Sequence, residues 1–158
     1  MNIIRPARKN RKTIWILLVI TILISIIGLV SYLLADSSDK KLAGYKQRGN
    51  EYLMKDNYIG AKEEFRKAVK LDPDNLILYF QLAEACIGLE DYSTAADYLD
   101  QAITIAEEGP MDIEQYESLV IKLEECYRIT GEELKREKLL QHSLELTDSD
   151  RIKELLSN

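Results

Sequence analysis

The sequence predicts an all-α protein in which one N-terminal transmembrane helix precedes a short α-solenoid of about three helix pairs and a C-terminal capping helix. Three observations lead to this fold class. Residues 13–35 carry no charged side chain. Residues 42–109 contain a pattern that recurs after 34 residues, and residues 111–157 have apolar side chains at helical spacing.

The charged residues are divided unevenly along the chain. The 158 residues include 21 Lys and Arg and 27 Asp and Glu, for a net charge of -6, and no acidic residue precedes Asp36. The acidic remainder of the chain would repel phosphate, which disfavours a general nucleic-acid-binding protein. Two cysteines, no CxxC motif and a single histidine likewise disfavour a disulfide scaffold or a structural zinc site.

The uncharged run over residues 13–35 is long enough for a membrane helix. At 1.5 Å per residue it would measure about 34 Å, against about 30 Å for a hydrocarbon core. Trp15 and Tyr32 lie near its ends, where aromatic rings favour the membrane interface. A cleaved signal peptide is the alternative, but the run is too long and lacks a clear small-x-small cleavage site. We therefore expect an uncleaved signal-anchor.

The flanking residues predict the topology of this single-pass membrane protein. The tail over residues 1–12 carries five basic side chains, so the positive-inside rule places it in the cytoplasm and the following domain outside. Thr21, Ser25 and Gly28 share one helical face that could contact another membrane helix, although such residues are also common in membrane helices generally. A polar linker is expected over residues 36–41, before a helical domain over residues 42–158.

Two segments of this domain, residues 42–75 and 76–109, align with each other at a spacing of 34. Each reads as two amphipathic helices joined by a turn. The aligned pairs are Tyr45 with Tyr79, Tyr58 with Tyr92, Ala61 with Ala95, Phe65 with Leu99 and Ala68 with Ala102. The apolar face of the first unit's second helix is Ala61, Phe65, Ala68, Val69 and Leu71. Small Ala61 would let the two helices approach, Phe65 would fill the space between them, and Asp72-Pro73 would end the second helix.

These residues resemble the tetratricopeptide repeat (TPR) family. The motif of the first unit is Tyr45-x2-Arg48-Gly49-x2-Tyr52, then Ala61-x3-Phe65, Ala68 and Pro73. It departs from the family at Arg48, where Leu is preferred, and at Tyr45, where Trp is preferred. The second unit has Tyr79-x2-Leu82-Ala83-x2-Cys86, then Ala95-x3-Leu99 and Ala102, and lacks the terminal proline. The resemblance implies a TPR-like α-solenoid.

A degenerate third helix pair is expected over residues 111–147, because two repeats alone bury too little apolar surface. Arg136 stands where the family has Ala, so either the packing differs there or the register is shifted. Residues 149–157 predict a short capping helix, with Ser149 or Asp150 as its N-cap. The apolar stripes of the pair are Tyr116, Leu119, Val120, Leu123 and Tyr127, then Leu139, Leu140, Leu144 and Leu146.

The family resemblance also implies a groove lined by the first helix of each repeat, which would bind a partner protein or an extended peptide. The alternative is that these side chains simply pack on neighbouring helices. The residues at groove positions are Lys46, Asn50, Leu53, Met54, Ile77, Phe80, Glu84 and Ile87, with Ala43 and Gly88. From Leu71 to Ile121 there are twelve acidic residues and no Lys or Arg, which suggests a partner with a basic surface or merely a solvated face.

Some family members hold a terminal carboxylate with Lys and Asn on the first repeat, and Lys46 and Asn50 match those positions. The clamp is incomplete, since Gln81 replaces an expected Asn and Lys122 would add a cation only in one register. The sequence shows no phosphate-binding glycine loop, nucleophile elbow or histidine metal motif, so we expect no enzyme, cofactor or metal. Cys86 and Cys126 are expected to be buried free thiols rather than a disulfide.

The functional expectation is a membrane-anchored interaction module that acts as an adaptor or assembly factor for a bacterial envelope complex. The alternative is an integral structural subunit of a membrane complex, held mainly by its transmembrane helix. Both readings place the protein in the cell membrane, and neither identifies its partner or its cellular process.

Overall fold

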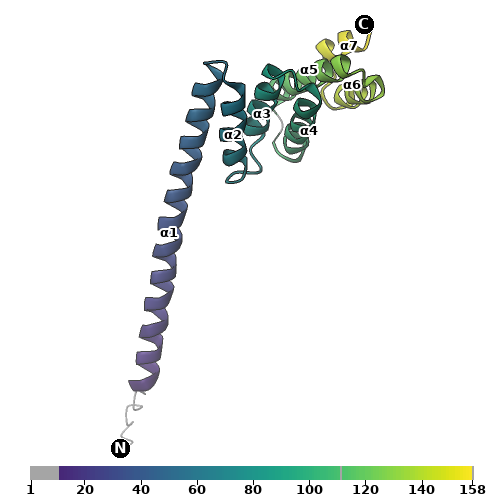
Figure 1. The fold of residues 1–158 in the computed structure, drawn as a ribbon. Helices are drawn as coiled ribbons and strands as arrows, with labels where there is room; N and C mark the ends of the chain where they lie inside the picture. Colours follow the sequence, from purple (N-terminus) through teal and green to yellow (C-terminus); the bar gives the residue numbers. More distant parts are fainter. Residues whose placement is uncertain (1–10, 111, 158) are drawn as a thin grey trace, which may run out of the picture. The chain divides into compact units, whose positions relative to one another are not determined.

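The computed structural model describes residues 11–110 and 112–157, and the regular structure of these residues is entirely α-helical (Figure 1). The chain divides into two compact units, Met1–Lys40 and Lys41–Asn158. Most of the predicted basic tail, and residue 111 at the start of the predicted third pair, lie outside the described residues. The helices are α1 (Arg11–Leu53), α2 (Tyr58–Val69), α3 (Leu76–Gly88), α4 (Tyr92–Glu108), α5 (Ile113–Thr130), α6 (Glu133–Thr147) and α7 (Asp150–Ser157). The predicted all-α class is confirmed.

The first part of α1 carries an exposed apolar surface. The side chains from Trp15 to Tyr32 are exposed, and most of them are large and apolar. Among the described helices, α1 alone is long and apolar enough to cross a membrane by length and composition. Residues 36–41, expected as a polar linker, are helical and belong to α1. They include no proline or glycine, so nothing in their backbone chemistry ends a helix.

In the second unit the helices pack in chain order, each against the next from α2 to α7. Four of the helices begin at N-cap side chains: Asn57 accepts from the amide of Gly60, Asn75 from Ile77, Asp91 from Thr94 and Asp112 from Gln115. α2 ends at Val69, before the predicted stop at Asp72-Pro73, and Leu71 lies outside the helix and is exposed. The predicted place of Leu71 on the apolar face of this helix is therefore wrong.

The core of the first repeat is built as its small residues predict. Ala61 and Phe65 of α2 are fully buried. Gly49 of α1 lies against the Phe65 ring so closely that an added Cβ would stand 2.5 Å from its Cε1 atom. A small residue on each helix thus brings α1 and α2 together around one aromatic ring.

The third helix pair is present as α5 and α6, and α7 follows it. The predicted stripe on α5 is confirmed, since all five of its side chains are buried. On α6 only Leu140 of the predicted stripe is fully buried, and Leu146 is exposed. Ile152 of α7 is fully buried and joins the same apolar cluster as Leu140, so the short last helix covers the end of the stack.

Candidate functional site

A groove of about 500 Å³ lies between α3 and α5. Its apolar side chains come from both helices, and its acidic side chains come from the start of α5. We call it the α3–α5 groove. It is lined by Leu76, Ile77 and Phe80 of α3, by Glu114, Gln115, Ser118 and Leu119 of α5, and by the α5 cap Asp112.

A smaller pocket of about 300 Å³ lies farther along the same two helices, next to the end of α1. We call it the Lys122 pocket. Gly88, at the end of α3, lies directly against the ring of Tyr58, so no side chain fits between them. The pocket is lined by Leu53, Tyr58, Glu84, Ile87, Gly88 and Lys122.

Lys122 lies between the two hollows. Its Nζ atom is 3.5 Å from Glu84 Oε1 and 5.2 Å from the centre of the Phe80 ring. Both members of the ion pair are about one-third exposed, so the pair stabilises the domain by less than about 1 kcal/mol. Its main effect is local, because the carboxylate and the aromatic face together neutralise and fix this cation.

The predicted groove residues divide into those that line a hollow and those that do not. Ile77 and Phe80 line the α3–α5 groove, and Leu53, Glu84 and Ile87 line the Lys122 pocket. Gly88 lines the latter as well. Lys46, Asn50, Met54 and Ala43 line neither of these two hollows.

Several residues at the incomplete carboxylate clamp are already engaged in contacts within the domain. Gln81 Nε2 donates to Asn50 Oδ1 at 2.7 Å, so the amide of α3 binds the amide of α1. Gln81 Oε1 is buried and has no hydrogen-bond partner among the described residues. Lys122, the candidate later cation, is paired with Glu84. Of the two predicted clamp cations, Lys46 is the one that has no ion-pair partner among the described residues.

The contribution of α5 to the groove was missed by sequence reasoning. The first residues of α3 and α5, Leu76 and Ile113, are 37 positions apart rather than 34. The difference arises because α4 has 17 residues where α2 has 12, while the connection after α4 is two residues shorter than the connection after α2. The sequence does contain a signal for this shift, namely the spacing between Asn75 and Asp112, which are the N-cap residues of α3 and α5.

The rim of the α3–α5 groove is negatively charged. Asp112 Oδ1 accepts from the Gln115 amide at 3.0 Å, so this carboxylate interacts with the N-terminus of α5. Glu114 is exposed, and neither carboxylate has an ion-pair partner in the part of the chain that the structure describes. The groove therefore presents apolar walls beside two unpaired carboxylates.

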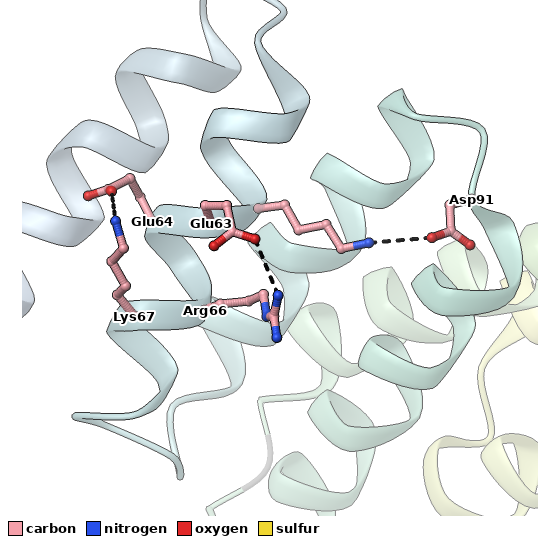
Figure 2. Close-up of polar contacts among 6 residues, drawn as sticks. Glu63, Glu64, Arg66, Lys67 and Asp91 are labelled. Carbon is pink, nitrogen blue, oxygen red and sulfur yellow. Dashed lines mark hydrogen bonds and ion pairs between the residues drawn. The ribbon is translucent and has the colours of Figure 1, made fainter.

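Four basic residues of the first repeat form ion pairs, in contrast to that rim, and three of these pairs are drawn in Figure 2. Lys62 Nζ is 3.4 Å from Asp91 Oδ2, and Arg66 Nη1 is 3.2 Å from Glu63 Oε1. These contacts join α2 to the start of α4 and stiffen the exposed face of α2. Part of the positive charge of the first repeat is thus neutralised inside the domain.

Glu64 is the most buried acidic residue of this repeat. Its carboxylate accepts from Lys67 Nζ at 2.5 Å and from Arg48 Nε at 2.6 Å. Burial opposes the charged form, but the hydrogen bonds from Lys67 and Arg48 outweigh it and hold the pKa of Glu64 below its ordinary value. Arg48, which departs from the family pattern, therefore links α1 to α2.

The small-residue face of α1 is open. Thr21, Ser25 and Gly28 are exposed, and a Cβ added at Gly28 would meet no atom within 4 Å. The Thr21 hydroxyl donates to the Leu18 carbonyl at 2.9 Å, which satisfies it within the helix. The face thus has room for a neighbouring helix.

The described residues contain no group of three His, Cys, Asp or Glu side chains placed to hold a metal ion. Cys86 and Cys126 are buried and unbonded, as predicted. Burial raises the pKa of both thiols, that of Cys126 to about 11, so neither is a nucleophile at neutral pH.

A family model and a curated protein each match part of this chain. Residues 52–121 match the tetratricopeptide repeat family model. The chain is also similar to stress-induced-phosphoprotein 1 of Caenorhabditis elegans, with 38% identity over 60 residues. That match covers 38% of this chain and spans only 19% of the relative's length.

Two solved structures show the same fold. The N-terminal domain of the C. elegans stress-induced protein-1 aligns with a TM-score of 0.67 at 16% identity, covering 76% of this chain and 94% of that one. The second TPR domain of human RPAP3, in complex with the HSP70 peptide SGPTIEEVD, aligns with a TM-score of 0.60 at 19% identity. There the coverage is 76% of this chain and 95% of the other.

Proposed function

We propose that this protein, whose residues 52–121 match the tetratricopeptide repeat family model, is a membrane-anchored interaction module that holds a partner protein at the membrane surface. The repeat domain supplies protein–protein recognition. The anchor raises the local concentration of the domain near membrane-bound partners. We propose that it acts as an adaptor or assembly factor for a cell-envelope complex.

The α3–α5 groove is the observation that carries this proposal. It joins exposed apolar surface to a polar rim, which is the composition expected of a site for a peptide segment. Ile77 is 47% exposed there although it is large and apolar. An apolar residue of a partner would remove this surface from water.

The fold's relatives support a peptide as the bound species. The human RPAP3 domain was solved with an HSP70 peptide, and the first TPR domain of Spaghetti with the HSP90 peptide SRMEEVD. A short segment that binds in a preformed site would require little rearrangement of the repeats. We infer the same mode of binding for this protein, without inferring the same partners.

The apolar half of α1 supports the membrane anchor. An exposed run of large apolar side chains from Trp15 to Tyr32 would be unfavourable in water and favourable in lipid. We propose that α1 crosses the cell membrane once, with the basic tail in the cytoplasm and the repeats outside.

An integral structural subunit remains the second candidate, because the Thr21, Ser25 and Gly28 face is open for a membrane helix. In that case the transmembrane helix, rather than the groove, would determine which partner is bound. Substitutions in the groove and on this helix face would therefore affect partner binding differently in the two cases.

Site-specific photocrosslinking in cells tests the proposed function. A benzoylphenylalanine placed at Ile77, inside the groove, is expected to capture a discrete partner in the full-length protein. The matched control is the same probe at Leu134 of α6, which is 67% exposed but lines neither hollow. Adducts at Leu134 only, or at neither position, would contradict the proposal.

A further inference from the structure

We propose that the α3–α5 groove selects a cationic segment of its partner, in which an apolar side chain enters the groove and a Lys or Arg meets Asp112 and Glu114. The inference rests on the proposed function and specifies the chemical class of the partner.

The walls supply the apolar part of the recognition. Leu76, Ile77 and Phe80 face Leu119 across the groove, and the volume of about 500 Å³ accommodates one or two large side chains. The segment's apolar residue would bury its own surface and the exposed part of Ile77 together. This contact gives affinity but no preference for charge.

The carboxylates supply the preference for charge. Asp112 and Glu114 stand on the rim, and the sequence from Leu71 to Ile121 contains no Lys or Arg to compensate them. Lys122 is the one cation that lines either hollow in the described part of the chain. Since it is held by Glu84 and the Phe80 ring, it does not neutralise the rim at Asp112 and Glu114.

The negative charge of the groove rim has the same sign as the charge of the peptides in the related structures. Those peptides end in Glu-Glu-Val-Asp and are acidic. An acidic segment in the α3–α5 groove would meet two unpaired carboxylates at close range, which is repulsive. A basic segment would be attracted, and more strongly at low ionic strength.

Selection from a random library tests the inference without knowledge of the partner. The full-length protein in mild detergent is used to select phage-displayed random dodecapeptides. Selected peptides are then synthesised and their Kd is measured with three further proteins. The test variant is Asp112→Asn with Glu114→Gln, in which Asn keeps the N-cap of α5.

The control variant also loses two negative charges, through Asp97→Asn on α4 and Glu145→Gln on α6. Both residues are exposed and lie outside the groove lining. The third protein, Ile77→Ser, shows whether a peptide uses the groove at all. Circular dichroism of each variant confirms that the helices are retained.

The inference predicts peptides that combine Lys or Arg with an apolar residue and that lose affinity in Ile77→Ser. The Asp112→Asn/Glu114→Gln protein should bind them roughly tenfold more weakly, and the control no more than about twofold more weakly. Raised salt should remove most of the difference.

Acidic or uncharged peptides that depend on Ile77 would overturn the inference while leaving the groove as a protein-binding site. Basic peptides that bind the test and control variants equally well would overturn it too, because the attraction would then come from the general surface. Failure to select any peptide that depends on Ile77 would contradict both the inference and the proposed function.

Discussion

Arg136 Nε lies 2.6 Å from Glu124 Oε1, and this ion pair joins α6 to α5. The two side chains are only 15% and 7% exposed. Arg136 Nη2 also donates to the Leu155 carbonyl of α7 at 3.0 Å. The residue that stands in place of the family's Ala therefore connects the last three helices, which is why the packing of α6 departs from the repeat pattern.

Replacement of Arg136 is expected to destabilise this end of the domain. Arg136→Met leaves Glu124 buried without its cation, a change that typically costs about 3–5 kcal/mol. The free energy of unfolding is measured in urea, with hydrogen exchange to follow α7. Lys153→Met, which removes exposed ion pairs with Asp148 and Asp150, is the control and should cost much less. Equal effects of the two substitutions would contradict the assigned role of Arg136.

Gly49→Ala is expected to destabilise the first repeat by about 1–3 kcal/mol. The new Cβ would overlap the Phe65 ring, and Phe65 is fully buried and cannot move away. Gly44→Ala on the same helix is the matched control, since its Cβ would meet only the flexible end of Arg48, at 3.4 Å. The control should be neutral or more stable by up to about 1 kcal/mol in urea unfolding, owing to helix propensity. A harmless Gly49→Ala would disprove the close packing of α1 on α2.

Glu64 should make the stability of the domain depend on pH in the acid range. Its pKa is lowered in the folded state, so its charge stabilises the fold above the ordinary Glu pKa of about 4.3. This contribution is lost as the pH falls through the lowered folded-state value. Glu64→Gln should reduce stability at pH 7 and flatten the decline in stability towards pH 3. Glu63→Gln, which removes the exposed ion pair with Arg66, is the control and should change neither the stability at pH 7 nor its decline towards pH 3. An unchanged pH profile in Glu64→Gln would refute the role assigned to Glu64.

The proposed topology predicts which end of the chain can be labelled from outside the cell. Ser157 is exposed, whereas Cys86 and Cys126 are buried, so Ser157→Cys provides the accessible thiol of the described residues. An impermeant maleimide should label this variant in intact cells, and the parent protein should stay unlabelled until it is denatured. Labelling of Ser157→Cys only after lysis would place the repeats in the cytoplasm.

The sequence identified the features that depend on local chemistry. Ala61 and Phe65 were placed at the helix contact from their size and spacing, and both are fully buried. The prediction of a linker at residues 36–41 is wrong, because charged and serine side chains are compatible with a helix as well as with a linker. The sequence pattern alone does not distinguish these two outcomes.

The groove was predicted only in part, because it depends on how helices are placed and not on any one motif. Ile77 and Phe80 were found from the family positions, and both line the α3–α5 groove. Glu114 and Ser118 were missed, since the longer α4 shifts the third pair out of the 34-residue register. Lys46 and Asn50 match a family motif, yet Asn50 is bound to Gln81 across the stack.

The central claim is that the groove, not the membrane helix, selects the partner. The most direct measurement is quantitative co-purification from mild detergent of the full-length protein, of Ile77→Ser, and of the triple variant Thr21→Leu, Ser25→Leu and Gly28→Leu. Our account predicts that Ile77→Ser loses the partner and that the triple variant retains it. Retention by Ile77→Ser, with loss in the triple variant, would contradict the account and assign recognition to the membrane helix.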